Sequence, residues 1–309
     1  MIRFGVMVFV ALVCSMAVLS AVFLFLRPKN MATAAIKAPD ALAAAALAVP
    51  AEALAKAEVQ KKLNILIVPG HDVRDGGACY KDICERDLTA AIAQKIAEIL
   101  GTQSQYKVTV ARDTQNWDSK LQEYFDTQKQ TIIDWKNARQ AESKALMESG
   151  AVKYVPDMAY HSQASPEMSV KLYGTNKWAD ENNIDLVLNL HFNDSGRPKM
   201  DQPGGFKGCA IFIPESQMKN HAASEAAANY VFRELKKVEP PEVDNLLEDQ
   251  SLIALGASGT LSAASMLVEY GYIYEQKLED ETSRQRALDE FAAQTALGVE
   301  EYFDSLDKK

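Results

Sequence analysis

Histidine is scarce in this chain, and two of its histidines stand where they could bind a metal. The sequence contains 4 histidines among 309 residues. His71 follows the apolar run 65–70, and His191 follows a second apolar run at 186–190. Both runs are typical of buried parallel strands, whose carboxyl ends gather at one edge of a sheet where ligands bind. We therefore expect the two imidazoles to face one crevice.

Two glutamates complete a set of residues suited to metal-assisted hydrolysis. Glu85 begins the helix that is expected after the first strand. Two imidazoles and one carboxylate suit catalytic zinc, because they leave a fourth position for water, whose pKa the metal lowers. Glu269 follows the apolar run 266–268. It could take the proton of that water and return it to a departing amine.

Each of these residues also has an ordinary structural interpretation. A single histidine after a strand is more often a packed or surface residue than a ligand. Glu85 could simply be a favourable negative charge at a helix N-terminus, and Glu269 could be a structural carboxylate with satisfied hydrogen bonds. Spacing by itself therefore supports a metal site without deciding it.

The motifs taken together resemble the zinc-dependent N-acetylmuramoyl-L-alanine amidase family, often called Amidase_3. Four segments occur in that family's order, and the resemblance covers about residues 63–305. They are a Pro-Gly-His motif ending at His71, a helix-initiating glutamate at Glu85, a histidine after an apolar strand at His191, and an apolar-Glu-x-Gly-aromatic motif around Glu269.

The resemblance implies a role for each matching residue. It implies that His71, Glu85 and His191 bind one zinc ion and that Glu269 is the catalytic glutamate. The implied reaction is hydrolysis of the amide bond between N-acetylmuramic acid and L-alanine in peptidoglycan. The implied fold is that of the amidases, which is also described as phosphorylase/hydrolase-like.

Other positions fit the family less closely. Arg112, after the second expected strand, and Asn193, two residues past the last ligand, match positions for which we expect a substrate-positioning role. Val68 and Asp72 stand where the family usually has an acidic residue and a glycine around the Pro-Gly-His motif. These differences leave the ligands intact but change the residues that support them.

Two other functions are compatible with the same residues. A zinc peptidase or deacetylase could use this ligand set on another cell-wall amide, and a non-catalytic wall-binding module could keep the fold without turnover. The net charge of −9 argues against a nucleic-acid partner, because binding phosphates requires a basic face. A protein activator is a further possible partner.

The N-terminal residues predict a membrane anchor. Residues 4–26 carry no charge, and such a helix would span about 34 Å, enough for a hydrocarbon core of about 30 Å. A cleaved signal peptide is the alternative interpretation. We expect a transmembrane anchor at 1–29, an Ala/Pro-rich linker at 30–62 and an extracytoplasmic catalytic domain at 63–309.

Alternating apolar runs and helical periodicity predict an α/β domain. Strands are expected at 63–68, 107–111, 184–190, 208–213 and 266–268, and the main helices at 85–100, 216–237 and 280–304. This order favours a mostly parallel sheet of about five or six strands with helices on both faces.

Two local features allow alternative interpretations. Residues 114–170 form a mostly helical insertion that is rich in aromatic residues, which either pack as core or form a lid or glycan-contacting surface. Cys79 and Cys84 could close a small loop as a disulfide in an exported protein, or they could remain two thiols.

Overall fold

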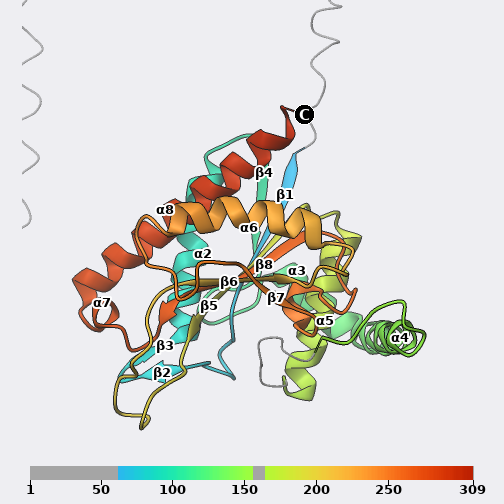
Figure 1. The fold of residues 1–309 in the computed structure, drawn as a ribbon, viewed down its shortest axis with the longest axis horizontal. Helices are drawn as coiled ribbons and strands as arrows, with labels where there is room; N and C mark the ends of the chain where they lie inside the picture. Colours follow the sequence, from blue (N-terminus) through green and yellow to red (C-terminus); the bar gives the residue numbers. More distant parts are fainter. Residues whose placement is uncertain (1–61, 156–163, 309) are drawn as a thin grey trace, which may run out of the picture. The chain divides into compact units, whose positions relative to one another are not determined.

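A six-stranded sheet forms the centre of the domain (Figure 1). All neighbouring strands pair in parallel except β8 and β6, so the prediction of a mostly parallel sheet is confirmed. From one edge to the other, the strands are β4 (Tyr106–Val110), β1 (Leu63–Pro69), β5 (Leu186–Asn193), β8 (Ala264–Tyr272), β6 (Ala210–Pro214) and β7 (Leu247–Asp249).

Helices cover both faces of this sheet, which explains why its strands read as continuous apolar runs. Along β1, Ile65 and Ile67 belong to one core cluster, whereas Leu66 and Val68 belong to another on the opposite face. The first and larger cluster is formed with α2 (Glu85–Gly101), α6 (His221–Leu235) and α8 (Glu281–Leu306).

The opposite face is covered largely by the insertion, which gathers on one side of the domain in Figure 1. Its helices are α3 (Ser119–Thr127), α4 (Lys129–Glu148) and the start of α5 (Pro166–Glu181), which continues past residue 170. Trp117, Tyr124 and Trp135 pack against the second core cluster. The expectation that the insertion supplies helical packing is confirmed for these three aromatic side chains.

Several short elements complete the domain. A hairpin of β2 (Cys79–Tyr80) and β3 (Ile83–Cys84) forms a separate two-stranded sheet directly before α2. A disulfide joins Cys79 to Cys84, so the disulfide interpretation is confirmed and that of two thiols is wrong. The short helices η1 (Ile253–Leu255) and α7 (Gln276–Glu279) flank β8 along the chain.

These coordinates come from a computed structural model that describes residues 62–155 and 164–308. The expected anchor at 1–29 lies outside the described residues, as does the expected linker except for Lys62. Among the helices of the two described ranges, none is sufficiently long and apolar to cross a membrane.

Candidate metal centre

The four residues predicted to do chemistry come from four elements that meet at the carboxyl end of the parallel strands. His71 lies just beyond β1, and Glu85 is the first residue of α2. His191 lies in β5, one strand away from β1, and Glu269 lies in β8 directly opposite His191 in the strand register. Neighbouring strands are about 4.8 Å apart, so this register places the backbones of His191 and Glu269 side by side.

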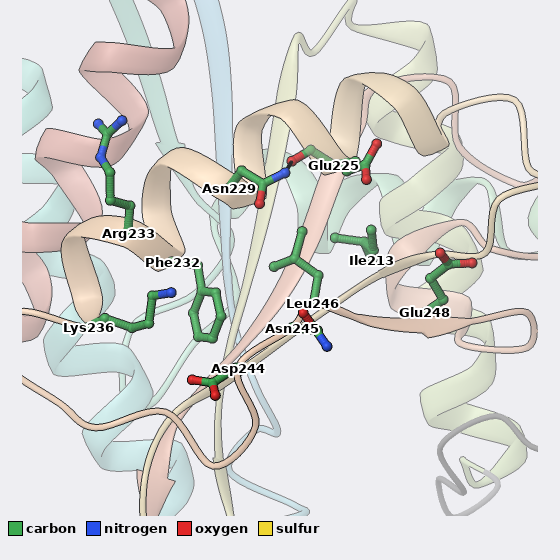
Figure 2. Close-up of a pocket in the computed structure, with 10 residues that line it drawn as sticks. All are labelled: Ile213, Glu225, Asn229, Phe232, Arg233, Lys236, Asp244, Asn245, Leu246 and Glu248. Carbon is green, nitrogen blue, oxygen red and sulfur yellow. Dashed lines mark hydrogen bonds between the residues drawn. The ribbon is translucent and has the colours of Figure 1, made fainter.

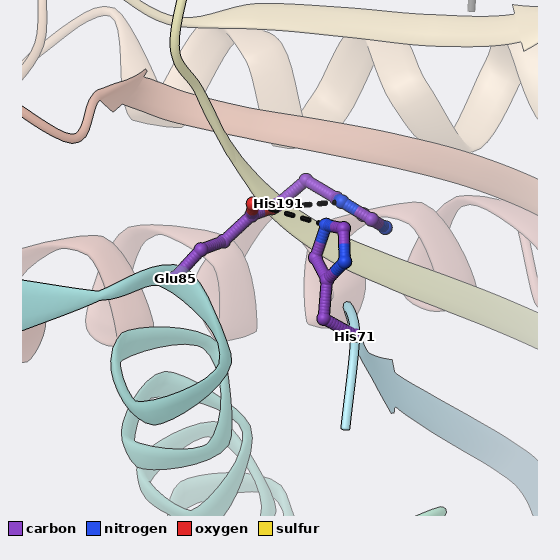
Figure 3. A group of neighbouring side chains, drawn as sticks. All are labelled: His71, Glu85 and His191. Carbon is purple, nitrogen blue, oxygen red and sulfur yellow. Dashed lines mark hydrogen bonds and ion pairs between the residues drawn. The ribbon is translucent and has the colours of Figure 1, made fainter. Parts of the chain in front are cut away.

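Glu85 is the centre of the cluster, because each of its oxygens meets one imidazole and one backbone amide. Its Oε1 lies 2.9 Å from Nδ1 of His191 and accepts a hydrogen bond from the amide of Phe192 at 3.0 Å. Its Oε2 lies 3.0 Å from Nε2 of His71 and accepts one from the amide of Ala78 at 3.1 Å. Figure 3 shows the two imidazoles converging on this carboxylate.

This arrangement fits a zinc ion on grounds of distance and donor chemistry. Ligand atoms of His71, Glu85 and His191 all lie within 4.8 Å of one another. Donors about 2.0–2.2 Å from a tetrahedral zinc lie about 3.4 Å apart. The separations around Glu85 are therefore close to those that a shared ion requires, and two nitrogens with one oxygen form a set that zinc prefers.

Two glycines make room for this cluster. A Cβ atom on Gly70 would lie 2.5 Å from Cε1 of His191, and one on Gly77 would lie 2.5 Å from Oε2 of Glu85. Real Cβ atoms do not approach other atoms so closely, so any side chain here would displace a ligand. Glycine is thus required at both positions for the three ligands to meet.

The charges within the cluster stabilise one another. Burial opposes ionisation of Glu85, but hydrogen bonds from His191 and His71 outweigh it and lower the pKa of the carboxyl well below 4.5. For His71, burial disfavours the cation, but the hydrogen bond and charge of Glu85 prevail and raise the imidazole pKa above 6.5. Without a metal, a proton can therefore occupy the ligand nitrogen, and metal binding must displace it.

Glu269 differs from the ligands in having an unsatisfied oxygen. The residue is 8% exposed, and its Oε2 has no hydrogen-bond partner among the described residues. Burial, followed by the negative charges of Glu85 and Glu242, raises the carboxyl pKa well above 4.5. A raised pKa makes this carboxyl hold a proton more readily than an ordinary glutamate, which suits a group that must return a proton to a leaving amine.

Arg112 contacts the turn behind the ligands. Its guanidinium donates hydrogen bonds to the carbonyl oxygens of Pro69 at 3.2 Å and Arg86 at 3.1 Å, and to that of Gly70. It also donates to Oγ1 of Thr89 at 3.1 Å. Because the side chain is buried and bonded to backbone, its contacts support the segment that carries His71, while its substrate-positioning role stays a prediction.

Asn193 shapes the loop that follows β5. Its Oδ1 accepts hydrogen bonds from the amides of Asp194 at 2.7 Å and Ser195 at 3.1 Å. Its carbonyl oxygen accepts one from the amide of Ile273 at 2.9 Å. These contacts are again internal to the protein, and the proposed contact between Asn193 and substrate stays a prediction.

The residues that support the loop after His71 were not predicted from the sequence. Asp72 is 3% exposed and interacts with Lys171 and Trp117, both outside the four motifs. The sequence did contain a sign that Asp72 matters, since an aspartate replaces the glycine expected after the histidine. The partner of Asp72 could not be predicted, because Lys171 is one of many lysines in the sequence.

A separate cavity of about 370 Å³ lies away from this cluster, between α6 and residues 244–248 (Figure 2). Its lining carries both charge signs, with Arg233 on the helix, Lys236 directly after it, and Asp244 and Glu248 opposite. None of the residues predicted to do chemistry lines it. The cavity therefore lies apart from the candidate metal centre.

The fold is similar to that of solved amidases. The amidase CwlD from Clostridioides difficile, in complex with the GerS lipoprotein, has a TM-score of 0.53 and 17% identity, covering 79% of this chain and 100% of that chain. An N-acetylmuramoyl-L-alanine amidase from Clostridium difficile 630 has a TM-score of 0.51 and 18% identity, covering 79% and 98%. At these identities the likeness establishes the fold.

The sequence itself establishes the family. Residues 65–301 match the family described as N-acetylmuramoyl-L-alanine amidase, Amidase_3. Because this match includes most of the chain, the protein belongs to that family and to that class of enzyme. No curated protein matches the sequence.

Proposed function

We propose that this protein is a zinc-dependent hydrolase that cleaves the amide bond between N-acetylmuramic acid and L-alanine in peptidoglycan. The observation that carries the proposal is the convergence of His71 and His191 on Glu85, beside a buried glutamate with a free oxygen. Membership of the amidase family supports the substrate and the bond.

In this proposal, three residues hold the metal and a fourth transfers a proton. His71, Glu85 and His191 would hold the ion, which would lower the pKa of a water molecule and polarise the lactyl carbonyl. Glu269 would accept a proton from the attacking water at Oε2. It would then pass this proton to the nitrogen of L-alanine as the amide bond breaks. Its raised pKa favours the second transfer.

Product analysis tests this assignment directly. Purified protein would be loaded with one equivalent of zinc and incubated with peptidoglycan, and the soluble products would be identified by mass spectrometry. We expect stem peptides with a free L-alanine amine and intact glycan chains. Cuts between amino acids within the stem would identify a peptidase, and loss of acetyl groups would identify a deacetylase.

The alternative of a non-catalytic wall-binding module is tested by the same experiment. Such a module would bind peptidoglycan and release no fragments, whether or not zinc is present. The intact ligand cluster and the free oxygen of Glu269 favour turnover, because a module that only binds has no need for a buried, unpaired carboxylate.

We also propose that residues 1–29 anchor the enzyme in a membrane and that its catalytic domain lies outside the cytoplasm. The uncharged run at 4–26 and the substrate support this location. The Cys79–Cys84 disulfide supports it independently, because such bonds persist in oxidising compartments. Fractionation of cells making the full chain, or a chain that begins at residue 30, tests the anchor.

A protein activator is a further proposal. The precedent is the amidase from Clostridioides difficile that was solved in complex with a lipoprotein. If this chain requires an activator, the purified zinc-loaded protein will release few fragments until envelope proteins are added. Full turnover by the purified chain on its own would exclude the requirement.

A further inference from the structure

Helix α5 contacts the ligand loop, the segment after β1 that begins at Gly70 and carries His71, through a buried ion pair. Asp72, the residue directly after His71, lies against Lys171, which belongs to α5, the helix that begins in the insertion and continues past residue 170. The two side chains are 4% and 13% exposed. They are separated by 99 positions in the sequence, so the pair is a tertiary link between two parts of the domain.

The Asp72 carboxylate is fully occupied by contacts that fix the loop. Its Oδ1 accepts hydrogen bonds from the amides of Arg74 at 2.9 Å and Asp75 at 3.2 Å. Its Oδ2 accepts one from Nε1 of Trp117 at 3.2 Å, in addition to the ammonium of Lys171. That ammonium also lies 5.2 Å from the centre of the Trp117 ring. Trp117 of the insertion and Lys171 of α5 therefore supply two of the four contacts.

This loop needs such support because of its backbone. His71 has a φ of 62°, a conformation that residues other than glycine rarely adopt. An unusual backbone conformation persists only where its surroundings enforce it. His191 has no comparable need, because it lies within a strand that is paired on both sides.

We propose that Asp72 and Lys171 are positioning residues that hold His71 in its metal-binding orientation, so that helix α5 contributes to the metal centre. The proposal rests on the metal site proposed above. Removing the lysine would leave a carboxylate buried without its countercharge, which would disturb the loop that it organises. A second contact between the same regions, Arg74 with Glu167, is exposed on both sides and contributes little.

The test compares two lysines on the same helix. Lys177 also belongs to α5, is 12% exposed and pairs with Glu181, but it has no contact with the ligand loop. Zinc affinity of the full chain would be measured by competition with a chelator for Lys171→Met, Lys171→Arg and Lys177→Met. The absorption spectrum of the cobalt-loaded proteins would report the ligand geometry.

We expect Lys171→Met to weaken zinc binding by about 10–100-fold and to change the cobalt spectrum. Lys171→Arg, which keeps the charge, should restore most of the affinity, and Lys177→Met should stay within about twofold of wild type. If Lys171→Met fails to fold, Asp72→Asn, which is neutral and nearly isosteric, replaces it in the same comparison.

Two results would overturn the proposal, and they have different meanings. If wild-type protein binds zinc and Lys171→Met binds it equally well with an unchanged spectrum, the pair only attaches helix α5, and the proposed function stands. If wild-type protein binds no zinc at all, the proposed metal site is wrong and the positioning role is wrong with it.

Discussion

The ligand cluster and Glu269 lie at the same edge of the sheet, yet their surroundings are opposite. Both oxygens of Glu85 have partners, and two of these partners are imidazoles that lower the pKa of the carboxyl. Glu269, on the strand next to that of His191, has an oxygen without a partner among the described residues, and burial raises its pKa. The first environment favours a permanent anion that can bind a cation, and the second favours a carboxyl group that gains and loses a proton.

This contrast teaches how one site can use two glutamates for different work. The difference follows from which hydrogen-bond donors each backbone position offers. Glu85, at the start of a helix, accepts hydrogen bonds from the backbone amides of Ala78 and Phe192. Glu269, in the middle of a strand, projects from backbone groups that are already used in sheet pairing. Three measurements can break or sharpen the distinction.

The largest effect is expected from removing a ligand. His191→Ala should lose its stoichiometric zinc, and turnover should fall by more than about 10⁴-fold, because the metal's contribution and the proton transfer that depends on it both disappear. Metal content and peptidoglycan release would be measured together. His221→Ala is the matched control, since this histidine lies on α6 and bonds to the carbonyl oxygen of Pro214. Zinc retained by His191→Ala would contradict the ligand assignment.

A smaller effect is expected at the proton carrier. Glu269→Gln should keep one zinc per chain while kcat falls by about 10²–10⁴-fold, because an amide cannot transfer the proton. Glu215→Gln is the control, since Glu215 is 5% exposed and follows β6, whose antiparallel course takes it toward the other end of β8. Turnover near the wild-type rate in Glu269→Gln would remove this residue from the mechanism.

The smallest effect is a change in stability with pH. The folded-state pKa of Glu269 is raised above its ordinary value of 4.5, so its contribution to stability is present below pH 4.5 and is lost as pH rises through the folded value. In metal-free protein, Glu269→Gln should therefore melt about 2–4 °C above wild type at pH 8. Toward pH 4.5 the two melting temperatures should converge. A difference that is independent of pH would contradict the raised pKa of this buried carboxyl.

Much of the fold could be predicted because its strands and helices are long and strongly patterned. The strand expected at 63–68 is β1, and the helix expected at 85–100 is α2. The hairpin at Cys79–Cys84 and the strand Leu247–Asp249 were not predicted. Segments of two or three residues show no periodicity, and only their partners make them strands.

The sequence by itself determined which residues could bind a metal and in what order they occur along the chain. His71, Glu85, His191 and Glu269 were identified from motifs, because the apolar runs that precede or surround them and the start of a helix are local features of the sequence. That β8 continues past Glu269 to Tyr272 was not predicted. Family membership follows from the same order of motifs.

Only the tertiary structure decided how those residues are held. The pairing of Asp72 with Lys171, the close approach of Gly77 to Glu85 and the free oxygen of Glu269 all depend on segments distant in sequence. The sequence shows no pattern for a contact of this kind, because any of the many lysines could pair with any of the many carboxylates. The partner is fixed only when the helices pack against the sheet.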